Sequence, residues 1–148
     1  MPDHVSSPVR SKIMTSVRTK GTAPELIVRG CLYSAGYRYR LHQKRLPGNP
    51  DIVLRRFKTA IFVHGCFWHG HQCPRGKRPT SNVEFWSHKL DGNIARDKRV
   101  QKELTDLGWN VVIIWSCSVA SDCEALLSTL SRAKVMQRVG EIVGKKSC

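Results

Sequence analysis

The segment FVHGCFWHGHQC, residues 62–73, concentrates histidine, cysteine and aromatic side chains in twelve positions. A strand buried in a core does not need these groups, and a loop exposed to solvent would avoid so many reactive and apolar side chains. These residue types bind transition metals, transfer protons near neutral pH and stack on planar ligands. The segment is therefore the first candidate for a functional site.

Four thiol and imidazole side chains have a spacing that suits a structural zinc ion. A closed zinc site takes four tetrahedral ligands, and three thiolates with one imidazole form a suitable set. The spacing is not that of a standard zinc knuckle, so the alternative is core cysteines and a solvated histidine. The candidate ligands are Cys66, His71, Cys73 and Cys117.

A carboxylate and two histidines suggest a second site. Asp51 starts a predicted strand, His64 ends the next one, and His69 follows in the same loop. Adjacent antiparallel strands can bring such ends together, where a carboxylate can hold Mg²⁺ and a histidine can accept a proton. The alternative is an Asx turn at Asp51 and a packed His64. Together, in a basic protein, these residues favour metal-assisted phosphodiester cleavage.

Aromatic and polar side chains suggest contacts with bases. Phe67 and Trp68 have ligand-type neighbours, which argues against a simple core pair. Exposed aromatic rings on a basic protein can stack on bases or wedge between base pairs. Trp86, Lys89 and Asn93 recur at i, i+3 and i+7 of a predicted helix and could face a groove. The alternative is a core Trp86 and a solvated Lys89.

The charge of the chain is high and unevenly distributed. The 148 residues carry a formal net charge of +14 at pH 7. Residues 1–50 hold nine Lys/Arg and two acids, a net charge of +7. Residues 51–100 hold ten Lys/Arg and four acids, a net charge of +6. Residues 101–148 hold six Lys/Arg and five acids, a net charge of only +1. Solubility alone would not require this polarity, so a polyanion, most simply nucleic acid, is the favoured partner.

Length and composition predict one compact domain over residues 1–148. Residues 1–20 are expected to form a basic N-terminal arm, and residues 140–148 a flexible tail. No apolar run has the length of a membrane span and no signal peptide is recognisable, so a cytoplasmic protein is expected. A cytosolic setting disfavours disulfides. Cysteines without an assigned role are Cys31, Cys123 and Cys148.

The first predicted helix begins after Thr22 and ends near Gly36. Thr22 and Glu25 have capping-box spacing, and a glycine often follows a helix end. Residues at i, i+4 and i+8 form the stripe expected to face the core. This stripe consists of Ile27, Cys31 and Ala35.

Strand patterns occur in three places. Residues 37–41 alternate like a half-exposed strand, and residues 51–65 predict two strands around a basic turn. The continuous apolar run at 109–115 predicts a buried strand.

Two further helices complete the pattern. The longer one has a capping box at Ser81 and Glu84, an expected break near Gly92 and an end at Gly108. The last helix covers residues 123–137. The order of elements predicts a mixed sheet flanked by helices.

Together these segments resemble the very-short-patch repair (Vsr) endonucleases over nearly the whole chain. The most specific pieces are RSKIM, LPGNPDIV, FVHGCFWHGHQC, EFWSHK with N-x-x-RD, and LGWNVVIIWSC. The resemblance implies an α/β fold of the PD-(D/E)xK restriction-endonuclease type, with a structural zinc site and the "PD" at Pro50-Asp51. Family members nick DNA 5′ of the thymine of a T:G mismatch left by deamination of 5-methylcytosine.

The resemblance also implies cofactors and partners. Mg²⁺ would serve catalysis and Zn²⁺ structure, and the substrate would be double-stranded DNA with a T:G mismatch. Mismatch-repair proteins are further candidate partners, whereas no membrane partner is expected. We expect a monomer in a bacterial cytoplasm.

Catalytic roles follow from the resemblance residue by residue. Asp51 would be the central Mg²⁺ ligand, with the backbone carbonyl of Val63 beside it. His69 would be the general base for the attacking water, and His64 would assist at the phosphate. Glu25 would support the metal site or its water, a role that competes with capping the helix.

The resemblance assigns the zinc to the four thiol and imidazole residues named above. Phe67, Trp68 and Trp86 would intercalate from the major-groove side, and Met14 would act from the minor groove. The zinc would then rigidify the loop that carries both the wedge and the catalytic histidines.

The chain departs from the usual patterns at several positions. Phe62 and His64 stand where the PD-(D/E)xK signature has an acid and a lysine, a departure that Vsr enzymes share. Val63 replaces a threonine, which preserves a metal contact through the backbone carbonyl but not one through a hydroxyl. Gly70 and Gln72 interrupt a histidine-rich run of the family.

Two alternative functions stay open on the sequence. One is a restriction-type PD-(D/E)xK nuclease with another target. The other is a zinc-stiffened DNA-binding module without catalysis.

Overall fold

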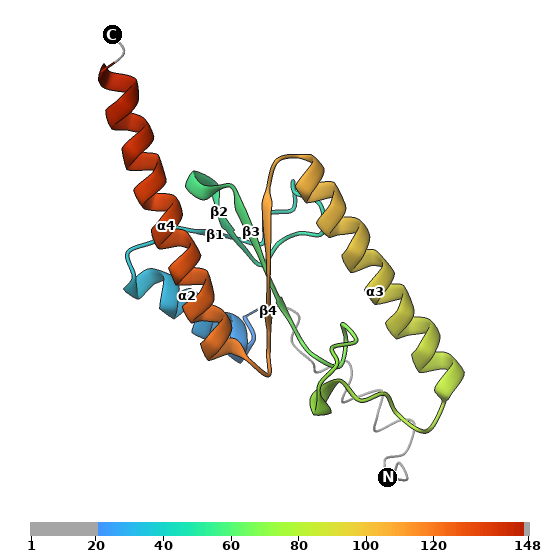
Figure 1. Cartoon of the computed structure of the whole chain (residues 1–148). Coiled ribbons are helices and arrows are strands. Elements are labelled where there is room, and N and C mark those ends of the chain that lie inside the picture. The colour runs from blue at the N-terminus through green and yellow to red at the C-terminus, as the bar shows by residue number, and fades with distance from the viewer. Residues whose placement is uncertain (1–20, 147–148) are drawn as a thin grey trace.

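The chain folds around a four-stranded mixed sheet (Figure 1). The structure is a computed structural model that describes residues 21–146, with side chains up to residue 143. Strand order is β1-β2-β3-β4; the first two pairings are antiparallel, and β3 pairs with β4 in parallel. The predicted mixed sheet is therefore confirmed. The strands are β1 (Arg40–Leu41), β2 (Ile52–Leu54), β3 (Thr59–His64) and β4 (Asn110–Trp115).

Strands β2 and β3 form the hairpin that positions Asp51. Their turn is a short 3₁₀ helix, η1 (Arg55–Phe57), followed by Lys58 in the left-handed region. Because Ile52 pairs with Ile61, Asp51 lies just before β2 and beside the end of β3. The prediction of two strands around a basic turn is confirmed.

Helices cover both faces of the sheet (Figure 1). Helices α2 (Ala23–Ser34) and α4 (Val119–Lys146) pack on one face, and α3 (Val83–Asp106) packs on the other. The first face buries side chains of α2, α4 and all three longer strands. The second joins Ala60 and Phe62 of β3 to Leu104 of α3. A second 3₁₀ helix, η2 (Pro74–Gly76), lies between β3 and α3.

The buried face of α2 differs from the predicted stripe. Val28 and Leu32 are fully buried, whereas Ile27 is 52% exposed. The observed buried stripe begins at Glu25. Because Glu25 is charged, the hydrophobic periodicity of the sequence does not reveal this stripe. The predicted capping box is also wrong, because Thr22 makes no side-chain cap and Glu25 accepts a hydrogen bond from the Gly21 N–H instead.

Helix α3 runs without a break through Gly92, so the predicted interruption is wrong. A glycine inside a helix costs about 1 kcal/mol relative to alanine. Burial of Trp86, Leu90 and Leu104 along one stripe outweighs that cost. The N-cap is Asn82, so the helix starts one residue later than the predicted cap at Ser81.

Two strands and the last helix differ in extent or burial from the predictions. Only Arg40 and Leu41 of the predicted strand 37–41 form β1. In β4, Ile114 alone is fully buried, because β4 is an edge strand that is open on one side. Helix α4 includes residues 140–146, which the sequence assigned to a flexible tail. Among the helices described here, none combines the length and apolar character needed to cross a membrane.

Candidate functional site

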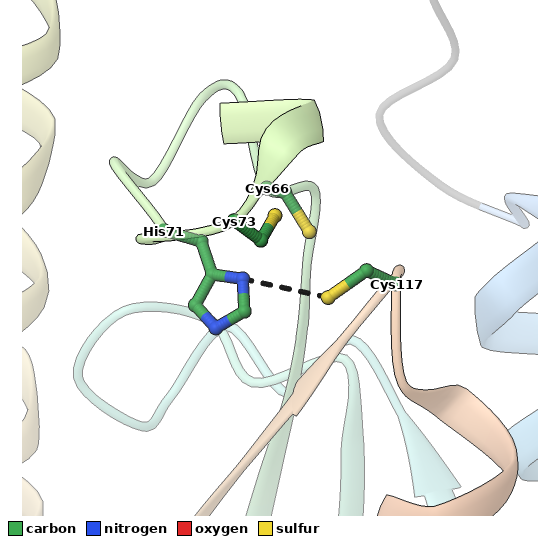
Figure 2. Close-up of side chains that lie close together, drawn as sticks. All are labelled: Cys66, His71, Cys73 and Cys117. Carbon is green, nitrogen blue, oxygen red and sulfur yellow. Dashed lines mark hydrogen bonds between the residues drawn. The ribbon is translucent and has the colours of Figure 1, made fainter. Parts of the chain in front are cut away.

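The ends of β3 and β4 bring the four predicted zinc ligands together. The two strands are parallel and in register, with His64 opposite Trp115. The loop after β3 therefore lies beside Cys117, which follows β4. Figure 2 shows the four side chains converging from these two segments. The ligand atoms of Cys66, His71, Cys73 and Cys117 all lie within 4.8 Å of one another.

The loop after β3 is folded by its own backbone hydrogen bonds. The His69 N–H donates to the Gly65 carbonyl at 3.2 Å, and the His71 N–H donates to the Cys66 carbonyl at 3.0 Å. Gly76 packs so tightly that a Cβ there would lie 1.9 Å from the His71 carbonyl oxygen. Only glycine fits this position, so the sequence itself specifies the compact loop.

Contacts around the cluster hold the ligands in place. The His71 ring stacks on Trp115 with centroids 4.1 Å apart, and its Nδ1 is 3.5 Å from the Cys117 Sγ. Burial raises the pKa of the Cys66 thiol, but hydrogen bonds from Ser116 and Cys117 outweigh it and lower the pKa to about 6. Desolvation and the neighbouring thiols raise the pKa of Cys117. Three thiols and one imidazole at this separation can hold a tetrahedral metal ion.

A second group of side chains lines a cavity of about 360 Å³ between the hairpin and α3. Asp51 accepts a hydrogen bond from the Val63 N–H through Oδ2 at 2.8 Å. Burial raises the pKa of Asp51, and this hydrogen bond opposes the shift. His64 and His69 line the same cavity. The structure thus brings three of the four residues predicted for catalysis together in one cavity.

The two histidines of the cavity stack face to face, with centroids 3.7 Å apart and planes 3° apart. His69 Nδ1 lies 2.6 Å from Oδ2 of Asp97, so this carboxylate orients the ring. His64 Nδ1 is buried and finds no hydrogen-bond partner in residues 21–146. Burial, and then the neighbouring His69, lower the pKa of His64 to about 4, so His64 is neutral at pH 7.

Asp97 is a site residue that the sequence reasoning missed. It belongs to the N-x-x-RD motif, for which the sequence predicted no role. On the continuous helix α3, Asp97 falls on the same stripe as the buried Leu90 and Leu104. A carboxylate on an otherwise apolar stripe was the available signal, but the predicted break at Gly92 obscured it.

Glu25 and His42 lie beside Asp51, although neither lines the cavity. Glu25 is 2% exposed and accepts hydrogen bonds from the Gly21 N–H and from Arg29. His42 Nε2 lies 3.1 Å from Oε1 of Glu25. The ligand atoms of Glu25, His42 and Asp51 lie within 4.8 Å of one another. His42 carried no sequence signal beyond its residue type.

The aromatic residues predicted to wedge into DNA form one cluster. Phe67 contacts Trp68 and Trp86 with centroid distances of 5.0 and 5.3 Å. Trp86 is buried, as the alternative interpretation held, whereas Phe67 and Trp68 are half-buried. The Nε1 of Trp86 makes no hydrogen bond within the described part of the chain. Trp86 therefore packs against the two rings that remain partly exposed.

The polar residues of α3 have different surroundings. Lys89 is exposed and lies over the Trp68 ring at 5.9 Å. The side-chain amide of Asn93 donates to the Trp68 carbonyl at 3.0 Å, which anchors the loop to α3. Met14 lies outside the described residues.

Comparisons with known proteins show the family of the chain. The family model for DNA mismatch endonuclease Vsr matches residues 2–75. The type II nicking enzyme V.XorIIP of Xanthomonas oryzae pv. oryzae is 48% identical over 130 residues, which cover 88% of this chain and 95% of that protein. V.NmeAIP of Neisseria meningitidis, also a type II nicking enzyme, is 41% identical over 134 residues, which cover 89% of this chain and 96% of that protein.

A third relative is the DNA mismatch endonuclease Vsr of Escherichia coli, 40% identical over 119 residues, with 80% of this chain and 76% of that protein covered. These relatives are DNA-cleaving enzymes, which confirms the class predicted from the sequence. The chain belongs to the Vsr family of DNA mismatch endonucleases.

Proposed function

We propose that this protein nicks double-stranded DNA on the 5′ side of the thymine in a T:G mismatch and so initiates very-short-patch repair. The observation that carries the proposal is the single cavity that contains Asp51, His64 and His69, in a chain of the Vsr family. We further propose the bacterial cytoplasm as its location, a monomer as its working state, and mismatch-repair proteins as additional partners.

Asp51 and the Val63 carbonyl would hold Mg²⁺ in this cavity. When bound, the ion neutralises charge on the phosphate during hydrolysis. The Val63 N–H already fixes Oδ2 of Asp51, so the carboxylate is oriented before an ion arrives. Glu25 would support this metal site through His42, because its own oxygens are engaged by Gly21 and Arg29.

The histidines would handle the proton and the phosphate. His69 would accept the proton of the attacking water, because its other ring nitrogen is held by Asp97. A carboxylate in that position stabilises the imidazolium that forms. His64 is neutral at pH 7 and would donate a hydrogen bond to the phosphate without adding charge.

We propose Zn²⁺ as the ion of the thiol cluster, since the Cys₃His set matches the preferences of zinc. We also assign the fold to the PD-(D/E)xK class, with the motif at Pro50-Asp51. Phe67 and Trp68, backed by Trp86, would wedge beside the mismatch from the major groove, with Lys89 and Asn93 near it. Met14 lies outside the described residues, so its proposed minor-groove role rests on the sequence alone.

A labelled duplex assay tests this function. Duplexes with a T:G mismatch in varied flanking sequences would be incubated with the protein and Mg²⁺, beside matched T:A controls. A nick 5′ of the mismatched thymine, absent from the controls and from samples with a chelator, is the expected result. A nick in the guanine strand or at another phosphate would contradict the proposal.

A second candidate function is cleavage of matched DNA at a specific sequence. Several relatives carry the name type II nicking enzyme, which motivates the alternative. Equal cutting of T:A and T:G duplexes in one flanking context would favour it. Membership of an endonuclease family leaves the non-catalytic DNA-binding module without support.

A further inference from the structure

His42 lies between two carboxylates of the candidate active site. Its Nε2 is 3.1 Å from Oε1 of Glu25, and its Nδ1 is 4.0 Å from Oδ1 of Asp51. The side chains of His42 and Asp51 are 17% and 21% exposed, whereas that of Glu25 is 2% exposed. His42 and Asp51 are therefore partly accessible to an ion from solvent, whereas Glu25 is not.

Glu25 determines which ring nitrogen of His42 carries the proton. Arg29 also approaches Nε2 of His42, at 3.4 Å. A guanidinium only donates hydrogen bonds and a carboxylate only accepts them. Nε2 of His42 can therefore either accept a hydrogen bond from Arg29 or donate one to Glu25. The contact with the carboxylate is shorter and charge-assisted, and it prevails. In the neutral ring, Nδ1 then has a free lone pair on the Asp51 side.

Asp51 has one carboxylate oxygen available to bind an ion beside Nδ1 of His42. Oδ2 accepts the Val63 N–H, which leaves Oδ1 toward His42. The 4.0 Å between Nδ1 and Oδ1 is too long for a hydrogen bond. One divalent ion with bonds of about 2.0–2.2 Å to each atom spans this distance.

The backbone fixes the positions of His42 and Asp51 relative to each other. Leu41 pairs with Ile52, so the residues that flank this pair, His42 and Asp51, are neighbours. The His42 N–H donates to the Asp51 carbonyl at 3.1 Å. His42 has a φ of 45°, in the left-handed region that few residues other than glycine adopt. A strained conformation held by hydrogen bonds is typical of functional positions.

We propose that Nδ1 of His42 and Oδ1 of Asp51 form a mixed nitrogen–oxygen site for a divalent ion, with Glu25 as the positioning residue of the ring. The arrangement is that of a metal-ligating histidine whose second nitrogen is held by a carboxylate. The assignment rests on the proposed metal-dependent function and adds a ligand to it. Imidazole nitrogen favours transition-metal ions over Mg²⁺, so His42 should raise the affinity of the site for an ion such as Mn²⁺ relative to Mg²⁺.

Paramagnetic Mn²⁺ tests this site in the zinc-loaded protein without DNA. Electron-spin-echo spectroscopy detects ¹⁴N of an imidazole bound directly to Mn²⁺, and a titration gives the affinity. The test variant is His42→Asn, because asparagine tolerates the left-handed backbone. His88→Asn, at an exposed position of α3, is the matched control. Asp51→Asn identifies which bound Mn²⁺ belongs to the site.

The expected result is ¹⁴N coupling in the wild type and in His88→Asn, and its loss in His42→Asn. The Mn²⁺ affinity of His42→Asn should fall about tenfold or more at unchanged thermal stability. The proposal would be overturned if Asp51→Asn binds as much Mn²⁺ as the wild type, or if the bound Mn²⁺ shows no coupling to nitrogen. If nitrogen-coupled Mn²⁺ is present but T:G duplexes are not nicked with any metal, the proposed function fails while the His42 assignment stands.

Discussion

The thiol cluster and the Asp51 cavity lie next to each other at the same end of the sheet, yet they are built differently. The thiol cluster gathers four ligands from two adjacent segments, and its members contact one another. The Asp51 cavity gathers side chains from the hairpin, the loop and α3, and it remains open over about 360 Å³. A closed ligand set suits a structural ion, whereas an open one leaves room for a substrate.

The largest effect is expected from Asp51→Asn, which removes the central carboxylate of the open site. The nicking rate should fall by about 10³-fold or more, since a bound metal ion contributes several kcal/mol to the transition state. Binding of a T:G duplex and the zinc content should stay the same. Asp91→Asn, at an exposed position of α3, is the control. A comparable loss in the control would contradict a specific role for Asp51.

Loss of the proposed general base should have the next largest effect. His69→Gln should lower the nicking rate by about 10³-fold, and Asp97→Asn by about 10²-fold. Because Asp97 acts through His69, the double variant should be no slower than His69→Gln alone. Single-turnover rates at saturating protein would measure both. Multiplicative losses in the double variant would show that Asp97 has an independent function.

Breaking the closed site should produce a different pattern. Cys73→Ser should release the zinc, lower the melting temperature and reduce nicking by about 10²-fold, because the loop that carries His69 loses its anchor. Metal analysis and calorimetry would be performed on the same sample. Cys31→Ala, outside the cluster, should retain the zinc. Full activity without zinc would remove the link between the two sites.

The outward-facing ring of the aromatic cluster should affect discrimination more than catalysis. Trp68→Ala should reduce the preference for T:G over T:A duplexes by about tenfold, the value of one lost stacking contact. Tyr33→Ala, at an exposed position of α2, serves as the control. Binding titrations on both duplexes measure the ratio. Equal losses of affinity on both would refute the wedge role.

The smallest effect is expected from Lys89, which lies over the Trp68 ring and is exposed. Lys89→Ala should weaken binding to both duplexes by a few-fold and reduce the slope of affinity against salt by about one. Lys102→Ala, farther along α3, should change neither. An unchanged salt slope in Lys89→Ala would place this cation away from the DNA backbone.

The convergence of the four thiol and imidazole side chains could be predicted because their residue types are chemically distinctive. The spacing of Cys66, His71 and Cys73 indicated a metal loop, and the apolar run before Cys117 indicated a neighbouring strand. The parallel pairing of β3 and β4 then explains why the four residues meet. Here residue type and strand order were sufficient.

The partners of the candidate catalytic residues could not be predicted in the same way. Asp97 reaches His69 only because α3 continues through Gly92, and tertiary packing decides that continuity. His42 reaches Asp51 only because β1 ends at Leu41 and the chain turns through a left-handed residue. Such local geometry has no periodic signature, so neither contact was visible in the sequence.

The parallel register of β3 and β4 has a consequence for folding. Cys66 and Cys117 lie at the two ends of a segment that contains the whole of α3. An ion bound by both closes a loop of about 50 residues, and closing that loop in the unfolded chain would cost entropy equivalent to about 4 kcal/mol, a cost that no longer opposes binding once β3 and β4 have paired. Metal affinity and docking of α3 are then thermodynamically linked. Zinc uptake would therefore report late folding, once the most sequence-distant strand pair has formed.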